Sequence, residues 1–278
     1  MSTRLWSWCL ILVLSPSLAL YAQEERGWTF SGRFQASKNS AGSILKLDPT
    51  LGYAFNPHVE TYAGVPAYFV NQSETTSTNS GFVNGIGNAY AGVRVGIDSP
   101  EVNFSSNLVV TAPTGDKDRG FSTGHATVDW TNSFSRRFSS FVPFVDVGVA
   151  NTVSDTSFFV RPFSTYGLVG HVDGGLLMNV VPLLDLGISA YSVRASGEQR
   201  IVSKVMRQSA AASVRSAGKR VFETNAETVG TADIANDGGF STWLSIKPQS
   251  RVYFDVGYTR SMTYDLNTVF FGTSIRFK

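Results

Sequence analysis

The sequence has a single cysteine, Cys9, few charged residues and no long hydrophobic run beyond its first residues. One cysteine cannot form an internal disulfide, so burial and backbone hydrogen bonds must hold the fold together. A formal net charge of +2 gives no field that would indicate nucleic acid as a partner. Short apolar runs exclude a polytopic helical membrane protein, and 42% hydrophobic residues exclude an intrinsically disordered chain.

Residues 1–22 have the pattern of a secretory signal peptide. Arg4 is basic, Leu5–Leu14 is apolar, Pro16 interrupts the apolar segment, and the pattern ends on the small residue Ala22. An uncleaved anchor is the alternative, but this apolar segment is too short to span a bilayer. We therefore predict export through the inner membrane, cleavage after Ala22 and a single domain over residues 23–278.

The rest of the chain alternates apolar and polar residues with the period of a β-strand. In the last segment Val269, Phe271, Thr273, Ile275 and Phe277 share one face, and the residues between them share the other. Twelve segments alternate in this way: Thr29–Lys38, Leu45–Phe55, Val59–Val70, Ile86–Asp98, Val102–Ala112, Ala126–Ser135, Phe141–Ala150, Thr165–Val180, Leu184–Arg194, Phe240–Lys247, Arg251–Thr259 and Val269–Lys278.

The connections between these segments alternate between short turns and longer polar loops. The short turns contain Pro, Asn or Ser, as at Asn56-Pro57-His58 and Val181-Pro182-Leu183, and the longest loop runs from Ala195 to Gly239. This pattern is typical of an all-β, transmembrane, up-and-down antiparallel β-barrel with short periplasmic turns and long extracellular loops. We expect about 12 strands, embedded in the lipids of the bacterial outer membrane.

A soluble β-sandwich is the alternative, but its polar faces would be rich in Lys and Glu. Here the polar faces carry mainly Ser, Thr, Asn, Gly and Tyr, which suits a wet, enclosed lumen. Aromatic residues also gather near the segment ends, as the interfacial girdles of a membrane barrel would require.

Two stretches resemble known bacterial outer-membrane proteins. Phe277 is the penultimate residue, and Phe271 and Ile275 share its face, which resembles the C-terminal signal that the barrel-assembly machinery recognises. The usual final aromatic residue is here followed by Lys278. The resemblance implies that this machinery is a partner of the chain.

The segment from Leu108 to Ala150 resembles the central region of the outer-membrane proteins grouped as the phenol-degradation meta-pathway (MetA-pathway) family. The family-like motif is a strand end followed by Pro113, Thr114, Gly115 and Asp116. The resemblance implies an outer-membrane transporter or channel, in some settings for aromatic or other hydrophobic compounds. Alternatively, the motif is only a turn, in which Pro stops the strand, Gly supplies a positive φ and Asp caps the loop.

The chain has little that would indicate catalysis. Its three histidines, His58, His125 and His171, do not cluster with other metal ligands in the sequence, and no nucleophile, zinc or phosphate-binding motif is present. We therefore expect no enzymatic activity, no metal and no cofactor.

Charged residues on the inward faces are the candidate functional residues, because inside a closed sheet they must pair or line water. The alternation predicts a pore lined by Arg33, Lys46, Asp48, Glu60, Arg94, Asp129, Asp146, His171, Asp173, Asp185, Arg251, Asp255 and Arg276. These residues would either form a polar eyelet that selects a small-molecule solute or an ion-pair network that closes the lumen.

The long loop contains a basic stretch, residues 199–220, without an acidic residue. Its first half has the spacing of a short amphipathic helix, with Ile201 and Val202 opposite Arg200 and Lys204. The stretch would constrict the mouth, extend the hairpin, contact surface lipopolysaccharide or remain a solvated loop. The sequence thus predicts a passive channel, with a closed barrel that acts through this loop as the alternative.

Overall fold

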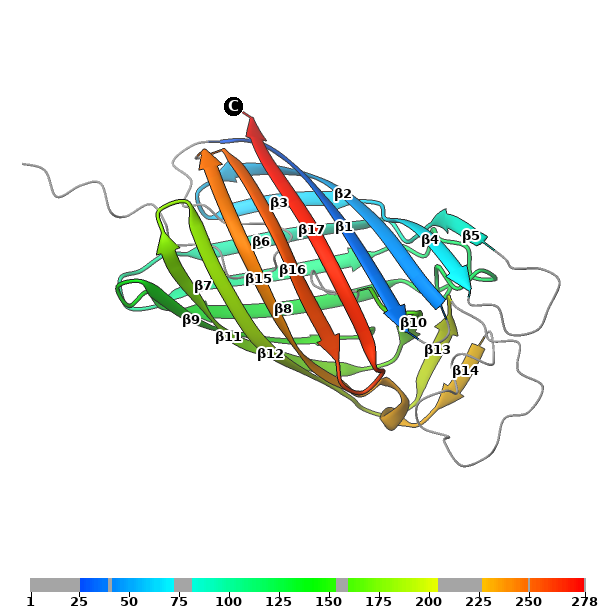
Figure 1. Ribbon diagram of the computed structural model, residues 1–278. Coiled ribbons are helices and arrows are strands. Elements are labelled where there is room, and N and C mark those ends of the chain that lie inside the picture. The colour runs from blue at the N-terminus through cyan, green and yellow to red at the C-terminus, as the bar shows by residue number, and fades with distance from the viewer. Residues whose placement is uncertain are drawn as a thin grey trace, which may run out of the picture.

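The fold is described from a computed structural model, over residues 26–39, 42–72, 82–153, 160–204, 227–249 and 251–277. These residues form one large antiparallel sheet that closes on itself, with a small second sheet at one end (Figure 1). The predicted signal peptide lies outside the described residues, as does most of the basic stretch.

Twelve crossings make up the barrel, as predicted, and two of them consist of two strands each. The crossings are β1 (Gly27–Asn39), β2 (Gly42–Asn56), β3 (Val59–Gly64) with β4 (Ala67–Gln72), β5 (Phe82–Ile86) with β6 (Tyr90–Ile97), β7 (Asn103–Thr111), β8 (Thr127–Ser135), β9 (Phe141–Ala150), β11 (Val169–Val181), β12 (Leu184–Ala195), β15 (Asp237–Gln249), β16 (Val252–Ser261) and β17 (Leu266–Phe277).

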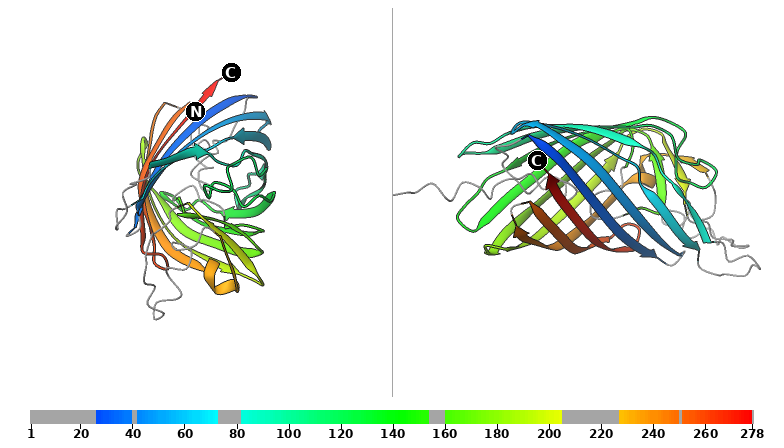
Figure 2. Two further views of the ribbon diagram at one scale, coloured as in Figure 1. Left: turned by 90° about the vertical axis from the view of Figure 1, so that its right-hand side faces the viewer. Right: turned by 90° about the horizontal axis from the view of Figure 1, so that it is seen from above.

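The first and last strands close the barrel. β1 pairs with β2 on one side and with β17 on the other, so that Arg33 lies opposite both Asp48 and Gly272. The end-on view shows the tilted strands arranged around the interior (Figure 2). Closure leaves every spanning strand with two neighbours, which satisfies the backbone without water.

The two faces of the sheet differ in the way that the alternation predicts. Outward side chains are large, apolar and exposed, as with Trp130 at 49% and Val269 at 56% exposure. Inward side chains are largely small and polar, and Ser245 and Thr259 are fully buried. An exterior of this kind is stable only against lipid, so the barrel spans a membrane.

Short connections join the strands at one end, called here the turn end. Most connections at the other end, called the loop end, are longer, but only two residues separate β1 from β2 there. Both termini of the barrel, Gly27 and Phe277, lie at the turn end, as an even number of crossings requires. The structure thus confirms the predicted alternation of short and longer connections, except between β1 and β2, where a longer loop over Asn39–Ile44 is predicted.

Parts of the predicted loops are strands. β10 (Phe163–Tyr166), β13 (Gln199–Ser203) and β14 (Glu227–Gly230) form the second sheet, followed by the 3-10 helix η2 (Ala232–Ala235). The predicted helix is therefore wrong over residues 199–203, because pairing with β10 and β14 extends this segment. Within the described ranges, no helix reaches the length and hydrophobicity of a membrane span.

Candidate functional site

The inner wall of the barrel is the candidate site, and it holds most of the predicted charged residues. Six of them are buried: Arg33, Lys46, Glu60, Arg94, Asp185 and Asp255. Six on the same face are partly exposed: Asp48, Asp129, Asp146, His171, Asp173 and Arg276. The prediction for Arg251 is wrong, because Arg251 lies exposed in the turn between β15 and β16, where strand alternation has ended.

A first group of charges joins β1, β2 and β16. The guanidinium of Arg33 lies 4.0 Å from the Asp255 carboxylate, which also accepts a 2.8 Å hydrogen bond from Ser245. On β2 the Lys46 ammonium lies 3.0 Å from Asp48, and the Tyr90 hydroxyl donates to the same carboxylate over 2.9 Å. Lys46 is thus neutralised by a carboxylate on its own strand, and Arg33 by one on β16, which β17 separates from β1.

A second group lies on β3, β6 and β7. Arg94, only 1% exposed, places Nη1 3.3 Å from Oε2 of Glu60, its direct cross-strand partner. The Arg94 guanidinium also lies 5.7 Å from the centre of the Tyr62 ring, and the Tyr62 hydroxyl donates to Asn107 over 2.8 Å. Desolvation strengthens the attraction within this group and makes each partner dependent on the other.

The neighbouring wall, on β8, β9 and β11, is acidic. Asp129 lies 3.3 Å from Nε2 of His171 and accepts a 2.8 Å hydrogen bond from Thr131. Asp146 and Asp173 are direct cross-strand partners. Among the described residues neither of these two side chains makes an ion pair, so two acidic groups face each other on the inner wall.

Asp185 lies nearer the turn end and binds a cation that the sequence analysis missed. The ammonium of Lys247 contacts its carboxylate, and Asn179 donates to it over 2.7 Å. Lys247 shares the inward face of β15 with Ser245 and ends the predicted segment Phe240–Lys247, so the alternation already placed it on that face.

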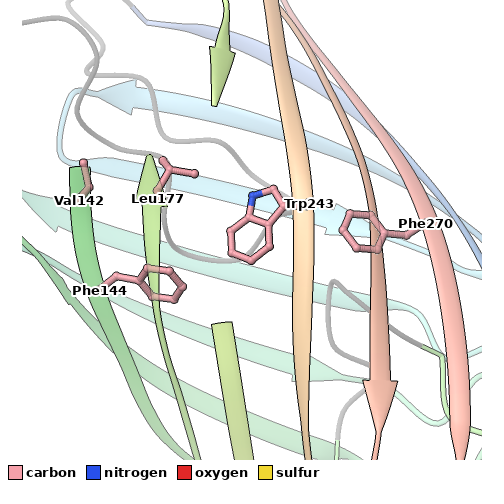
Figure 3. Packing of buried hydrophobic residues seen from close by; sticks show 5 residues of the cluster. All are labelled: Val142, Phe144, Leu177, Trp243 and Phe270. Atoms are coloured by element: carbon pink, nitrogen blue, oxygen red, sulfur yellow. The ribbon is translucent and has the colours of Figure 1, made fainter. Parts of the chain in front are cut away.

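An apolar cluster lies on the inner wall as well, so the lumen is less uniformly polar than predicted. It consists of Val142, Phe144, Leu177, Trp243 and Phe270 (Figure 3). These residues come from β9, β11, β15 and β17 and point inward from the wall.

At the loop end, side chains bridge the barrel mouth. Phe121, in the connection between β7 and β8, stacks on Tyr68 of β4 with ring centres 5.5 Å apart. Lys204, directly after β13, places its ammonium 5.0 Å from the same ring. β13 follows β12 in the chain. In the sheet, several strands lie between β12 and β4, namely β11, β9, β8, β7, β6, β3 and β2. The contacts of Phe121 and Lys204 with Tyr68 therefore connect distant walls of the barrel.

The small sheet is held at this end by buried polar contacts. Arg161 and Asp237 are fully buried and 3.5 Å apart, and Asp237 also accepts hydrogen bonds from Tyr191 and Ser261. Tyr264, in the β16–β17 connection, donates to the Ile234 carbonyl over 3.0 Å. Burial raises the pKa of Tyr264, so its phenol stays protonated.

The family-like motif holds together an interrupted part of the wall. The Thr114 hydroxyl accepts from Ala89 N over 2.8 Å, and Gly115 N donates to the Asn88 side chain over 3.0 Å. Asp116 caps its own loop by accepting from two backbone amides. The expected positive φ at Gly115 is wrong: glycine is needed there because a Cβ would lie 2.7 Å from the Phe121 carbonyl.

The remaining predicted residues lie outside the lumen. Phe271, Ile275 and Phe277 occupy the outward face of β17, with Phe277 51% exposed. In the described part of the chain, no three His, Cys, Asp or Glu side chains are grouped so as to hold a metal ion.

Comparisons with known proteins show the fold. No protein-family model and no curated protein matches the sequence. Among solved structures, an outer membrane channel from Pseudomonas putida F1 is similar with a TM-score of 0.61 and 10% identity, over 92% of this chain and 97% of that one. The NanC porin is similar with a TM-score of 0.51 and 10% identity, over 89% of this chain and all of that one. The chain therefore shares the fold of outer-membrane barrels.

Proposed function

We propose that the protein is a channel of the bacterial outer membrane that lets small molecules pass by diffusion, with the charges of its inner wall setting selectivity. The Asp146–Asp173 pair is the observation that carries this proposal. Two carboxylates without an ion pair attract a cation or a proton from the lumen, whereas a barrel stabilised only by side-chain packing has no need for them. The proposed role is passive and uses no catalytic group or cofactor.

The inner wall supports a mixed solute preference. The charged residues favour polar or cationic groups, and the cluster around Trp243 and Phe144 favours an apolar or aromatic body. Aromatic and other hydrophobic compounds are therefore the solutes we propose first, which agrees with the resemblance of the central segment. The proposed partners are outer-membrane lipids, lipopolysaccharide and the barrel-assembly machinery, the last through Phe271, Ile275 and Phe277.

Planar-bilayer recordings of the refolded protein test the proposal. We expect discrete conductance steps, and a cation preference that falls in Asp146→Asn and Asp173→Asn. Glu101→Gln, in an exposed turn, is the matched control and should leave the reversal potential unchanged. A silent barrel would refute the channel, and an unaltered reversal potential in both lumen variants would refute the role of the acidic pair.

The bridged mouth favours a second candidate, a closed barrel whose function lies in the basic stretch. Phe121 and Lys204 meet on Tyr68 and connect distant walls, which would restrict passage. Deleting residues 205–220 distinguishes the two candidates. Loss of binding to lipopolysaccharide vesicles with unchanged conductance would favour the closed barrel, whereas a larger conductance would identify the stretch as a constriction of the channel.

A further inference from the structure

Each aromatic ring of the apolar cluster lies directly over a glycine of the adjacent strand. In the register of the sheet, Trp243 is the cross-strand partner of Gly187, Phe144 of Gly175, and Phe270 of Gly257. All three glycines lie on the inward face of their strands, where a side chain would project into the lumen.

The rings occupy the space that a glycine leaves empty. A Cβ built at Gly187 would lie 2.1 Å from the Trp243 ring, and all three of its nearest atoms belong to that ring. At Gly175 and Gly257 a Cβ would come within 2.6 Å and 2.4 Å of the rings of Phe144 and Phe270, and also close to backbone oxygens. The rings therefore lie sideways along the wall and cover their partner glycines.

The same arrangement recurs at other levels of the wall. Tyr62 lies over Gly92 and His171 over Gly148, again as direct cross-strand partners. The recurrence indicates that inward aromatic rings of this barrel are generally positioned by a missing side chain on the neighbouring strand.

We propose that these glycines determine how far the aromatic rings project into the lumen, and that Gly187 is a specificity-determining position of the channel. This inference rests on the proposed function. A methyl group at position 187 would need the Trp243 ring to move by about 1.5 Å to reach ordinary contact distance. Since the backbone lies on the other side, the ring would move toward the lumen and narrow it.

Single-channel conductance of Gly187→Ala tests the inference. We expect a drop of about twofold or more, because a narrow section of the lumen dominates its resistance. Trp243→Ala should raise the conductance, and the double variant should behave like Trp243→Ala, because without the ring the added methyl group has nothing to displace. Gly174→Ala and Gly96→Ala are matched controls, since their nearest neighbours lie 3.8 Å and 3.7 Å away.

The position of the ring is measured independently of conduction. In a Trp28→Phe/Trp130→Phe background, Trp243 is the single tryptophan of residues 23–278, and a water-soluble quencher reports its exposure to the lumen. We expect stronger quenching in Gly187→Ala than in Gly174→Ala. A silent wild type would refute the channel, while the quenching would still show whether Gly187 positions the ring.

Three results would overturn the inference. Unchanged quenching in Gly187→Ala would mean that glycine does not position the ring. Unchanged conductance of Gly187→Ala in a conducting barrel would mean that the Trp243 ring does not determine the width of the lumen. A drop that persists in the Trp243→Ala background would assign the effect to the backbone or to assembly.

Discussion

The Arg94–Glu60 pair is the place where a single change should most affect stability. Both side chains are nearly inaccessible, at 1% and 8% exposure, and their charged atoms are 3.3 Å apart. Glu60→Gln keeps the shape of the side chain and removes its charge, so Arg94 remains buried beside a neutral amide. The Nε and Nη2 atoms of Arg94 already lack hydrogen-bond partners, so no other contact of the guanidinium replaces the lost attraction to Glu60.

Removing one partner of a buried ion pair costs about 3 kcal/mol, because the remaining charge stays desolvated. That loss corresponds to a change of about 150-fold in the unfolding equilibrium. The measurement is a urea titration of the refolded barrel in lipid vesicles, followed by tryptophan fluorescence and by heat-dependent gel mobility. Glu60→Gln should therefore unfold at a clearly lower urea concentration than the wild type.

Two further variants make the result decisive. Lys117→Gln removes an exposed pair with Glu227 and should cost less than about 1 kcal/mol. Glu60→Gln combined with Arg94→Met removes both charges and should recover most of the lost stability. If Glu60→Gln costs no more than Lys117→Gln, lumen water solvates Arg94 and the argument from desolvation is refuted.

Three other predictions concern the family-like motif and the last strand. Gly115→Ala should lower the free energy of unfolding by about 1–3 kcal/mol through steric overlap, and an effect no larger than that of Gly170→Ala, whose nearest neighbour is 4.0 Å away, would contradict this. Thr114→Val should cost about 1 kcal/mol in the same urea assay, since the amide of Ala89 loses its acceptor, and an unchanged midpoint would show that water replaces the hydroxyl. Phe277→Ser should slow insertion into vesicles that contain the assembly machinery and leave the urea midpoint unchanged, whereas equal insertion rates would remove this residue from the signal.

The sequence predicts the barrel well because lipid and lumen impose opposite demands on alternate residues. The segment Phe141–Ala150 is predicted to the residue, since it alternates throughout and is bounded by a turn and a polar loop. Gln199–Ser203 is predicted incorrectly, because its two apolar residues, Ile201 and Val202, suit either a helix or a strand. Its partners lie in β10 and β14, distant in sequence, and local periodicity contains no information about them.

The sequence likewise predicts the candidate site only in part. Which charges face inward follows from alternation, which identifies twelve of the thirteen predicted residues as inward and fails only at Arg251, in a turn. Which charges meet depends on the register between strands, and so the pairing of Arg94 with Glu60 and the facing carboxylates of Asp146 and Asp173 emerge only in the folded sheet. The aromatic rings over glycines depend on the same register.

The distribution of these charges leads to a prediction about salt. Arg33, Lys46 and Arg94 each lie beside a carboxylate, so their fields largely cancel at short range, whereas Asp146 and Asp173 have no ion-pair partner among the described residues. A solute in the lumen therefore meets an acidic wall formed by β9 and β11, whose negative potential depends on the ionisation of these two groups. The Debye length is about 30 Å at 0.01 M salt and about 3 Å at 1 M, so a cation preference due to this potential should be strong in dilute salt and nearly absent in concentrated salt.

Reversal potentials measured from about 0.01 M to about 1 M salt, at a fixed concentration ratio across the bilayer, test this salt dependence. A cation preference that persists at 1 M would mean that ions bind the carboxylates directly, because screening does not weaken a contact that contains no intervening water.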